Sequence, residues 1–285
     1  MMREHQGRLP SGPLIVGYAN WGECDSKIGQ AAAAGVNVLI WFAVSLIASP
    51  SGKPIISGGP NLTCVAKTAA SLRAAGLPTT HLISIGGWDA PHPNTTFTGS
   101  VWWDAWQNWN AAAKAPGFDG FDGFDWDLEG NDDQASPWNT FSVAGLHLVS
   151  DMSKLAKSHG FLVSMAPPQS YLDVETSAFS LSVTHPATCW HPEFLYAGRN
   201  VYAALLALAG GDTFDFVSLQ LYESWSVADC NISGLGQLPE VYLPRLAAAM
   251  AAGWTVDFSS VPALGLSKQV VSVPLDRLGF GFGQR

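Results

Sequence analysis

Charged residues are scarce in this sequence, and basic residues are scarcer than acidic ones. Asp, Glu, Lys and Arg together make up 13% of the 285 residues, and 23 acidic residues outnumber 14 Lys and Arg, for a formal net charge of −9. Nucleic acids and anionic membrane surfaces would repel such a chain, because both are negatively charged. The balance therefore excludes both as expected partners and leaves neutral ligands.

Long hydrophobic runs are also missing. No stretch reaches the roughly 18 consecutive apolar residues that a membrane-spanning helix needs. The first 13 residues, MMREHQGRLPSGP, contain basic residues with no apolar segment behind them. They predict an N-terminal tail and not a secretory signal peptide.

Cysteine is rare, with Cys24, Cys64, Cys189 and Cys230 as its four occurrences. No two of them stand in a C-x-x-C pair and no His lies at ligand spacing, so we expect no zinc site. If the chain is exported, disulfides are possible. The four cysteines follow the first, second, fifth and sixth strands, so the members of each pair would lie in neighbouring loops. We therefore expect Cys24 to pair with Cys64 and Cys189 with Cys230, out of three possible pairings.

Three N-x-[ST] sequons begin at Asn61, Asn94 and Asn231. Such sequons accept N-linked glycans in secreted proteins, although they also occur often by chance. We therefore suspect an extracellular or secretory location for a chain that shows no signal peptide.

What the sequence does have is apolar and aromatic content. Hydrophobic residues make up 47% of the chain and include 12 Trp, which is enough for a large core; we expect one domain over residues 14–285. Tryptophan rings serve equally well as core residues and as platforms for the apolar faces of sugars. We expect a monomer.

Short β-rich runs alternate with Ala-rich or amphipathic segments, which is the pattern of parallel βα units. No G-x-G-x-x-G or G-x-x-x-x-G-K-[ST] follows a predicted strand, so a nucleotide-binding open sheet is disfavoured. The interpretation is an α/β fold, a (β/α)₈ TIM barrel, with chemistry at the C-terminal ends of its strands. The expected strands are 14–18, 36–44, 81–87, 161–167 and 214–222, the expected helices are 26–34, 64–75, 103–113, 142–159 and 241–252, and 51–61 reads as a long loop.

The C-terminal segment predicts a seventh strand at residues 277–283, after which nothing follows. We therefore expect a barrel that is incomplete at its C-terminus, with strand eight missing and two unpaired edges. Such a chain would be an incomplete form of a longer protein, with low stability and weak activity.

The acidic segment GFDGFDGFDWDLEG, residues 117–130, is the most distinctive part of the sequence. In a strand, side chains alternate between faces, so Asp125, Asp127 and Glu129 share one face, with ~7 Å between successive members. Carboxylates so close together cannot all ionise easily, so at least one pKa should rise and provide a proton donor. Glu129 stands last, nearest the C-terminal end.

Two other interpretations of this segment are weaker. It resembles the opening of an EF-hand calcium loop, but the twelfth position, which should be Glu, is Ser136, and no helix precedes it. A solvated acidic turn is also disfavoured, because the interleaved Phe, Trp and Leu are poor residues to leave in water. We expect no metal.

At this segment the chain resembles the family 18 glycoside hydrolases, resembling most the smaller chitinases. Their strand-four signature D-x-x-D-x-D-x-E matches Asp122, Asp125, Asp127 and Glu129, and leaves Asp119 as a bystander at the strand entrance. VGYANW resembles the family's first strand, SIGGW its third, SMAPPQ its fifth and SLQLYE its sixth, so the likeness runs from about Leu14 to the C-terminus.

The resemblance implies substrate-assisted, retaining hydrolysis, in which the substrate's own acetamide replaces an enzyme nucleophile. Glu129 would be the acid, Asp127 would orient the acetamide, Asp125 would share a proton with it, and Tyr222 would hold the acetamide oxygen. Asp122, whose side chain would point to the opposite face of the strand, would be structural. No cofactor is implied. The expected substrate-binding residues are Tyr18, Trp21, Gly87, Trp88, Met165, Gln169, Gln220 and Trp225.

The implied substrates are chitin or chitooligosaccharides, polymers of β-1,4-linked N-acetylglucosamine. Two alternatives stay open. An endo-N-acetylglucosaminidase would cut the chitobiose core of N-glycans, and a chitinase-like lectin would bind the same sugar without cutting it. The lectin is disfavoured because such proteins usually lose the acid, whereas Glu129 is present here.

Overall fold

A computed structural model of the chain describes residues 7–19, 27–131, 133, 135–183, 199–223 and 226–283. The chain divides into two compact units. The first consists of Met1–Gly87, Pro91–Asp127 and Asp151–Val163, and the second of Trp88–Ala90, Leu128–Ser150 and Ser164–Arg285.

The strands of the first unit follow the predicted apolar runs. They pair in the order β1-β2-β4-β5, and β1 and β4 are both parallel to β2. Every residue of β4 and β5 is buried, as expected of parallel strands that are covered on both faces. The bounds are β1 Val16–Ala19, β2 Val38–Ala48, β4 Thr80–Gly87 and β5 Gly123–Leu128, whose last residue belongs to the second unit.

Helices connect these strands at the predicted places. Two of them begin at side-chain caps, because Asn61 and Thr98 accept hydrogen bonds from the third residue beyond each. Trp102, Trp103 and Trp106 of the second capped helix are buried. The helices are α1 Lys27–Ala33, α2 Leu62–Ala74, α3 Gly99–Ala112 and α4 Val143–Ser158, which extends across both units.

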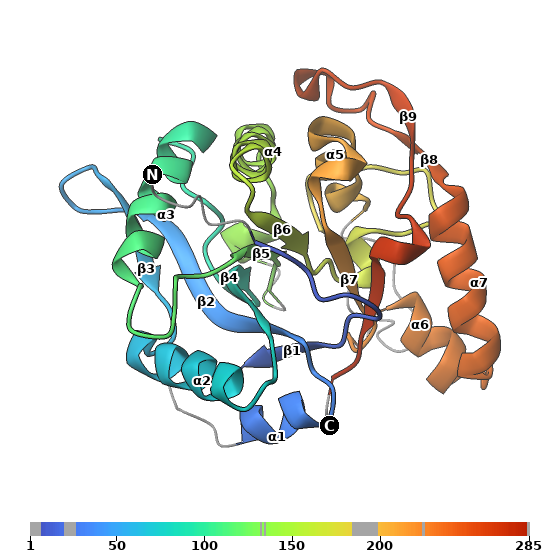
Figure 1. The fold of residues 1–285 in the computed structure, drawn as a ribbon. Helices are drawn as coiled ribbons and strands as arrows, with labels where there is room; N and C mark the ends of the chain where they lie inside the picture. Colours follow the sequence, from blue (N-terminus) through green and yellow to red (C-terminus); the bar gives the residue numbers. More distant parts are fainter. Residues whose placement is uncertain are drawn as a thin grey trace. The chain divides into compact units, whose positions relative to one another are not determined.

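The long loop expected at 51–61 is wrong. Its middle forms strand β3, Pro54–Gly58, which pairs antiparallel with the second half of β2 and lies beside α3 (Figure 1). The Gly and Pro residues suggested a loop, but Ile55 and Ile56 favour extended backbone. Gly52, with φ of +72°, lies in the turn that reverses the chain.

The second unit contains the end of β6 and two further parallel strands. β7 pairs with β6 on one side and with β10 on the other. β8 and β9 form a separate antiparallel pair. The bounds are β6 Leu162–Met165, β7 Phe216–Gln220, β8 Trp254–Asp257, β9 Lys268–Val271 and β10 Leu278–Gly281.

The longest helix of the second unit that was not predicted covers residues 201–209. Its sequence VYAALLALA is apolar on all sides, so it has no amphipathic period, and most of it is buried. The α-helices are α5 Val201–Ala209, α6 Val227–Asp229 and α7 Pro239–Ala252, and a π-helical segment, Cys230–Gly234, follows α6. Short 3₁₀ segments are Pro137–Asn139, Gln169–Tyr171, Gly211–Thr213, Pro262–Leu264 and Leu275–Arg277.

The strand order β1-β2-β4-β5-β6-β7-β10, with helices between mostly parallel strands, is that of an incomplete (β/α)₈ TIM barrel. This confirms the predicted fold class. The predicted seventh strand is β10, which ends the strand order. Among the helices described, none has both the length and the apolar character to cross a membrane.

Both described cysteines, Cys64 and Cys230, are in disulfide bonds. Cys24 and Cys189 lie outside the described residues. The pairing of the four cysteines therefore stays a prediction.

Candidate active site

Strand β5 separates polar from apolar side chains, as its alternation predicts. On one face, Asp125 and Asp127 are buried, with 0% and 3% of their surface exposed. On the other, the Trp126 Nε1 donates to Ser153 Oγ of α4 at 2.8 Å, and the Phe124 ring lies 5.2 Å from that of Trp106 in α3. The apolar face thus packs against helices and leaves the carboxylates on the interior face.

Asp125 has a side-chain hydrogen-bond donor from another strand of the same sheet. The hydroxyl of Tyr18, on β1, donates to Asp125 Oδ2 at 3.0 Å. The Tyr18 ring lies edge-on to Phe42, with 6.0 Å between centroids, and 43% of the residue is exposed. A donor aimed at a carboxylate favours its ionised form. Tyr18, predicted as a sugar contact, is therefore placed where it can also set the charge of Asp125.

The end of β4 requires glycine. Gly87 has φ of +111°, a conformation that other residues rarely adopt, and a Cβ there would lie 3.0 Å from the ring of Phe42. Backbone geometry and close packing therefore explain why residue 87 is glycine, and its contact with a substrate stays a prediction.

Glu129 follows directly after β5 and is partly exposed, unlike the two buried Asp residues. In the second unit, Gln220 Nε2 donates to Glu129 Oε1 at 3.2 Å and to the carbonyl of Ala166 at 2.7 Å. The second bond fixes the amide of Gln220 in position. Gln220, at the end of β7, can therefore orient the Glu129 carboxyl while that group keeps access to solvent.

Two tyrosines that the sequence analysis missed hold the backbone on either side of Glu129. The Tyr202 hydroxyl accepts from the amide of Leu128 at 2.6 Å and donates to its carbonyl at 3.1 Å. The Tyr171 hydroxyl accepts from the amide of Gly130 at 3.0 Å. Both tyrosines are fully buried. Their hydroxyls, which need partners when buried, replace strand hydrogen bonds where β5 ends.

The segment after β4 is anchored to the same loop. The amide of Asp89, whose φ is +60°, donates to the carbonyl of Gly130 at 3.2 Å. The preceding residue, Trp88, is 54% exposed. Trp88 is therefore accessible to a ligand, and its stacking on a sugar stays a prediction.

The remaining described candidates differ in accessibility. Met165 is fully buried in β6, and Tyr222, just beyond β7, is 55% exposed. Gln169 is buried, and its amide donates to the Tyr242 hydroxyl and accepts from the amide of Ala228, each at 2.7 Å. These contacts engage both ends of the Gln169 amide in holding the protein together.

A carboxylate that the sequence analysis did not select lies next to Tyr222. Glu223 accepts from the amide of Ser170 at 2.8 Å and from its hydroxyl at 3.2 Å. These bonds fasten the segment after β7 to the segment after β6. The SLQLYE run contains Glu223, but nothing in its spacing indicates this partner.

Asp122 directly precedes β5, at the end of the strand opposite Glu129, and bonds to the neighbouring strand β4. Its Oδ2 accepts from the amide of His81 at 2.8 Å, and its own amide donates to the His81 carbonyl at 2.8 Å. His81 Nδ1 accepts from Trp41 Nε1 at 3.1 Å. This nitrogen therefore carries no proton, and the imidazole ring is neutral. Burial lowers the pKa of His81 to about 4.

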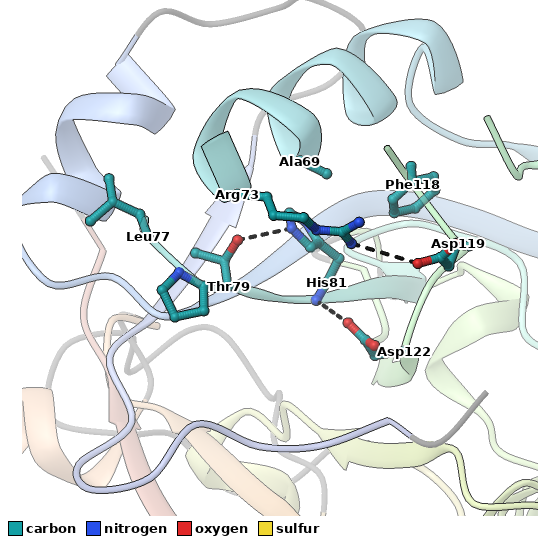
Figure 2. A pocket seen from close by; sticks show the side chains of 10 residues that line it. Ala69, Arg73, Leu77, Thr79, His81, Phe118, Asp119 and Asp122 are labelled. Atoms are coloured by element: carbon teal, nitrogen blue, oxygen red, sulfur yellow. Dashed lines mark hydrogen bonds and ion pairs between the residues drawn. The ribbon is translucent and has the colours of Figure 1, made fainter. Parts of the chain in front are cut away.

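A cavity of about 240 Å³ lies around these residues (Figure 2). At its rim, Arg73 and Asp119 are 3.7 Å apart, and both side chains are mostly exposed. The two carboxylates at the start of the acidic segment thus differ: Asp122 binds backbone, whereas Asp119 forms a surface ion pair.

Trp21 and Trp225, predicted to bind substrate, lie outside the described residues. Among the residues that are described, no cluster of three or more His, Cys, Asp or Glu could hold a metal ion.

No protein-family model matches the chain, and no curated protein matches it. Solved structures do match. The chitinase domain of the spore coat protein CotE from Clostridium difficile has a TM-score of 0.52 at 12% identity, over 95% of this chain and 65% of that one. A fungal endo-beta-N-acetylglucosaminidase from glycosyl hydrolase family 18 has a TM-score of 0.50 at 14% identity, over 94% and 89%.

The C-terminal domain of Legionella pneumophila ChiA matches at 18% identity with a TM-score of 0.48, over 74% of this chain and 58% of that one. The chain thus spans less than two thirds of the Legionella and Clostridium chains. At these identities the matches to the Clostridium and fungal structures establish a shared fold. They confirm the resemblance drawn from the sequence to family 18 glycoside hydrolases at the level of the fold.

Proposed function

We propose that this chain hydrolyses β-1,4-linked N-acetylglucosamine polymers, chitin or chitooligosaccharides, with Glu129 as the proton donor. The observation that carries the proposal is the ordering along β5: two buried aspartates on one face, followed on the same parity by a partly exposed glutamate. A general acid must reach the glycosidic oxygen, and of these three carboxylates Glu129 is the accessible one.

Glu129 would protonate the leaving oxygen while the substrate's acetamide carbonyl attacks the anomeric carbon. The bond to the leaving sugar breaks, a cyclic oxazolinium ion forms, and water opens it with retention of configuration. The hydrogen bond from Gln220 to Glu129 supports this role, because it holds the carboxyl in one orientation before the substrate arrives.

Asp127 would accept the acetamide N–H and stabilise the positive charge that develops on the ring. Asp125, two residues before it, would share a proton with Asp127, so the two carboxylates titrate as a pair. The Tyr18 hydroxyl on Asp125 Oδ2 supports an ionised Asp125. Tyr222, which is exposed, would contact the acetamide oxygen.

Sugar binding would use exposed rings and the ends of strands. Trp88 would stack on a pyranose, with Gly87 leaving room beside it. Gln169 and Met165 are both buried, so they would support the residues that form the binding surface. No cofactor is required, because acid catalysis and a neighbouring carbonyl suffice.

Endo-N-acetylglucosaminidase activity on N-glycans is a second candidate. The fold match to the fungal enzyme of that activity favours it, since that match covers most of both chains. The same acetamide chemistry would apply, and only the leaving group would differ. A non-hydrolytic lectin is a third candidate, which the retained Glu129 disfavours.

One panel of substrates separates these candidates. The purified chain is incubated with colloidal chitin, chitotetraose and a high-mannose glycoprotein, and the products are identified by mass spectrometry. We expect shorter chitooligosaccharides. Release of the glycan alone would favour the endo-acting enzyme, binding without any product would favour the lectin, and neither binding nor cleavage would contradict all three.

A further inference from the structure

Of the three sequons in the chain, the one at Asn61 lies in a position that can carry a glycan. Asn61 is exposed and directly precedes α2. Its Oδ1 accepts from the amide of Cys64 at 3.2 Å, which caps the helix. In the part of the chain that the structure describes, its Nδ2 has no hydrogen-bond partner. The capping bond uses the amide oxygen and leaves the nitrogen, the atom that N-linked glycans occupy, on the surface.

The hydroxyl residue of this sequon is equally accessible. Thr63 is exposed on the first turn of α2, and no described residue bonds its side chain. No hydrogen bond among the described residues therefore depends on the side chain of Thr63. A substitution at Thr63 can remove the sequon without disturbing the Asn61 cap.

The other two sequons are held within the fold. Asn94 is partly buried; its amide donates to Leu46, its carbonyl accepts from Trp102 Nε1, and its Oδ1 accepts from the amide of Thr96. These three bonds fix Asn94 on several sides.

Asn231 is also partly buried, within the π-helical segment after α6. Its Nδ2 donates to the carbonyl of Val227 at 2.9 Å, so the acceptor nitrogen is already engaged. Of the three asparagines, Asn61 alone is exposed.

The cysteines provide an independent reason to expect such chemistry. Cys64, three residues after Asn61, and Cys230 are both disulfide-bonded. Disulfides persist in oxidising compartments, which include the lumen of the endoplasmic reticulum. The sequon and the disulfides thus suit the same compartment.

We propose that Asn61 is an N-glycan acceptor when the chain passes through a secretory compartment. The co-reactant is an oligosaccharide linked through pyrophosphate to a lipid. The Asn61 Nδ2 forms a bond to the first sugar's C1 and loses a proton, and the bond from C1 to the pyrophosphate oxygen breaks as the lipid pyrophosphate leaves. The Oδ1 atom keeps its capping bond, so the modified residue still caps α2.

The test directs the full 285-residue chain, behind a cleavable leader, into the secretory pathway of a eukaryotic host. Wild type is compared with Thr63→Ala, which destroys the sequon, and with Thr63→Ser, which keeps it. The secreted protein is treated with an amidase that releases N-glycans and converts the carrier Asn to Asp. Electrophoresis then shows any mobility shift, and peptide mass spectrometry identifies the converted residue.

We expect a shift by one glycan in wild type and Thr63→Ser and none in Thr63→Ala, with Asn61 converted to Asp and Asn94 and Asn231 unchanged. A secreted wild-type chain with unmodified Asn61 would overturn the proposal. So would glycans of equal occupancy at all three sites, because exposure would then not select Asn61. Thr63→Ser reports whether a loss in Thr63→Ala reflects the sequon and not a failure to fold.

Discussion

The two ends of strand β5 hold carboxylates in opposite ways. At its start, Asp122 binds the backbone of His81 in both directions, next to a neutral imidazole. Within the strand, Asp125 accepts from a tyrosine hydroxyl, and Glu129, just beyond the far end, accepts from a glutamine amide. A carboxylate bonded to backbone stabilises one arrangement of the chain, whereas a side-chain donor orients a carboxyl group and leaves the backbone pairing of the strand unchanged. We propose that similar residues in this one short segment serve structure at one end and chemistry at the other.

The largest expected effect is at the chemical end. Glu129→Gln keeps the size and the hydrogen-bonding oxygen but removes the transferable proton, so we expect kcat on chitotetraose to fall at least about 10²-fold while binding persists. Steady-state kinetics and calorimetric titration with the oligosaccharide measure the two quantities. Asp119→Asn, an exposed change in the same acidic segment, serves as the matched control and should keep wild-type kcat. A Glu129→Gln protein that retains more than about a tenth of wild-type kcat would exclude this residue as the acid.

At the structural end, the main effect is on stability as a function of pH. The pKa of His81 falls from 6.5 in the unfolded chain to about 4 in the folded protein, because burial disfavours its charged form. Between these pH values the unfolded state binds more protons than the folded state. The contribution of His81 to the free energy of unfolding is therefore complete above pH 6.5 and is lost as the pH falls toward 4. The total contribution is about 3 kcal/mol at 1.36 kcal/mol per pKa unit.

Asp173 opposes this trend and offers a control. Burial raises its pKa from 3.8 to about 6, so its protonated form stabilises the fold at low pH, and that contribution is lost as the pH rises through 6. In Asp173→Asn the fall in unfolding free energy from pH 6.5 to 4 should therefore be steeper than in wild type. Urea denaturation at several pH values measures both slopes. Equal slopes in the two proteins would show that Asp173 does not contribute to the pH dependence, and the absence of any fall in Asp173→Asn would show that His81 does not.

Next in size is the contrast between the two aspartates at the strand entrance. Asp122→Ala leaves the amide of His81 without its carboxylate acceptor, and we expect a loss of about 1–3 kcal/mol in unfolding free energy. Asp119→Ala removes an exposed ion pair with Arg73 and should change stability by about 0.5 kcal/mol or less. Chemical denaturation compares the pair. Equal effects would mean that Asp122 has no special structural role.

The smallest expected effect is on the charge of Asp125. Tyr18→Phe keeps the ring beside Phe42 but removes the donor to Asp125 Oδ2, so we expect kcat/KM to fall by about tenfold or less, near 1.4 kcal/mol. Because the lost donor favours the ionised carboxylate, the acidic limb of the pH–rate profile should move to higher pH. An unchanged profile would mean that Tyr18 acts only as a surface for the sugar.

The sequence predicted those features that depend on local pattern. The βα alternation identified the parallel strands, and the period of two in β5 separated its carboxylates from Phe124 and Trp126. The pattern failed where tertiary contacts decide. Strand β3 forms because β2 extends far enough to pair with it, and α5 is buried on most sides, which removes the amphipathic signal.

The partners of the candidate site were also beyond the reach of the sequence. Tyr202 reaches Leu128 and Tyr171 reaches Gly130 across 74 and 41 residues, and no spacing rule relates such positions. Gln220 was selected through a motif, but its bond to Glu129 depends on where β7 ends. Long-range hydrogen bonds of this kind depend on the packing of the whole fold.

The central claim is that Glu129 works with the substrate's own acetamide and without an enzyme nucleophile. The most direct test is the anomeric configuration of the first product released from chitotetraose, followed by proton NMR before the anomers equilibrate. The account predicts the β-anomer, because the acetamide displacement and the attack by water each invert the anomeric carbon. Initial formation of the α-anomer would contradict it.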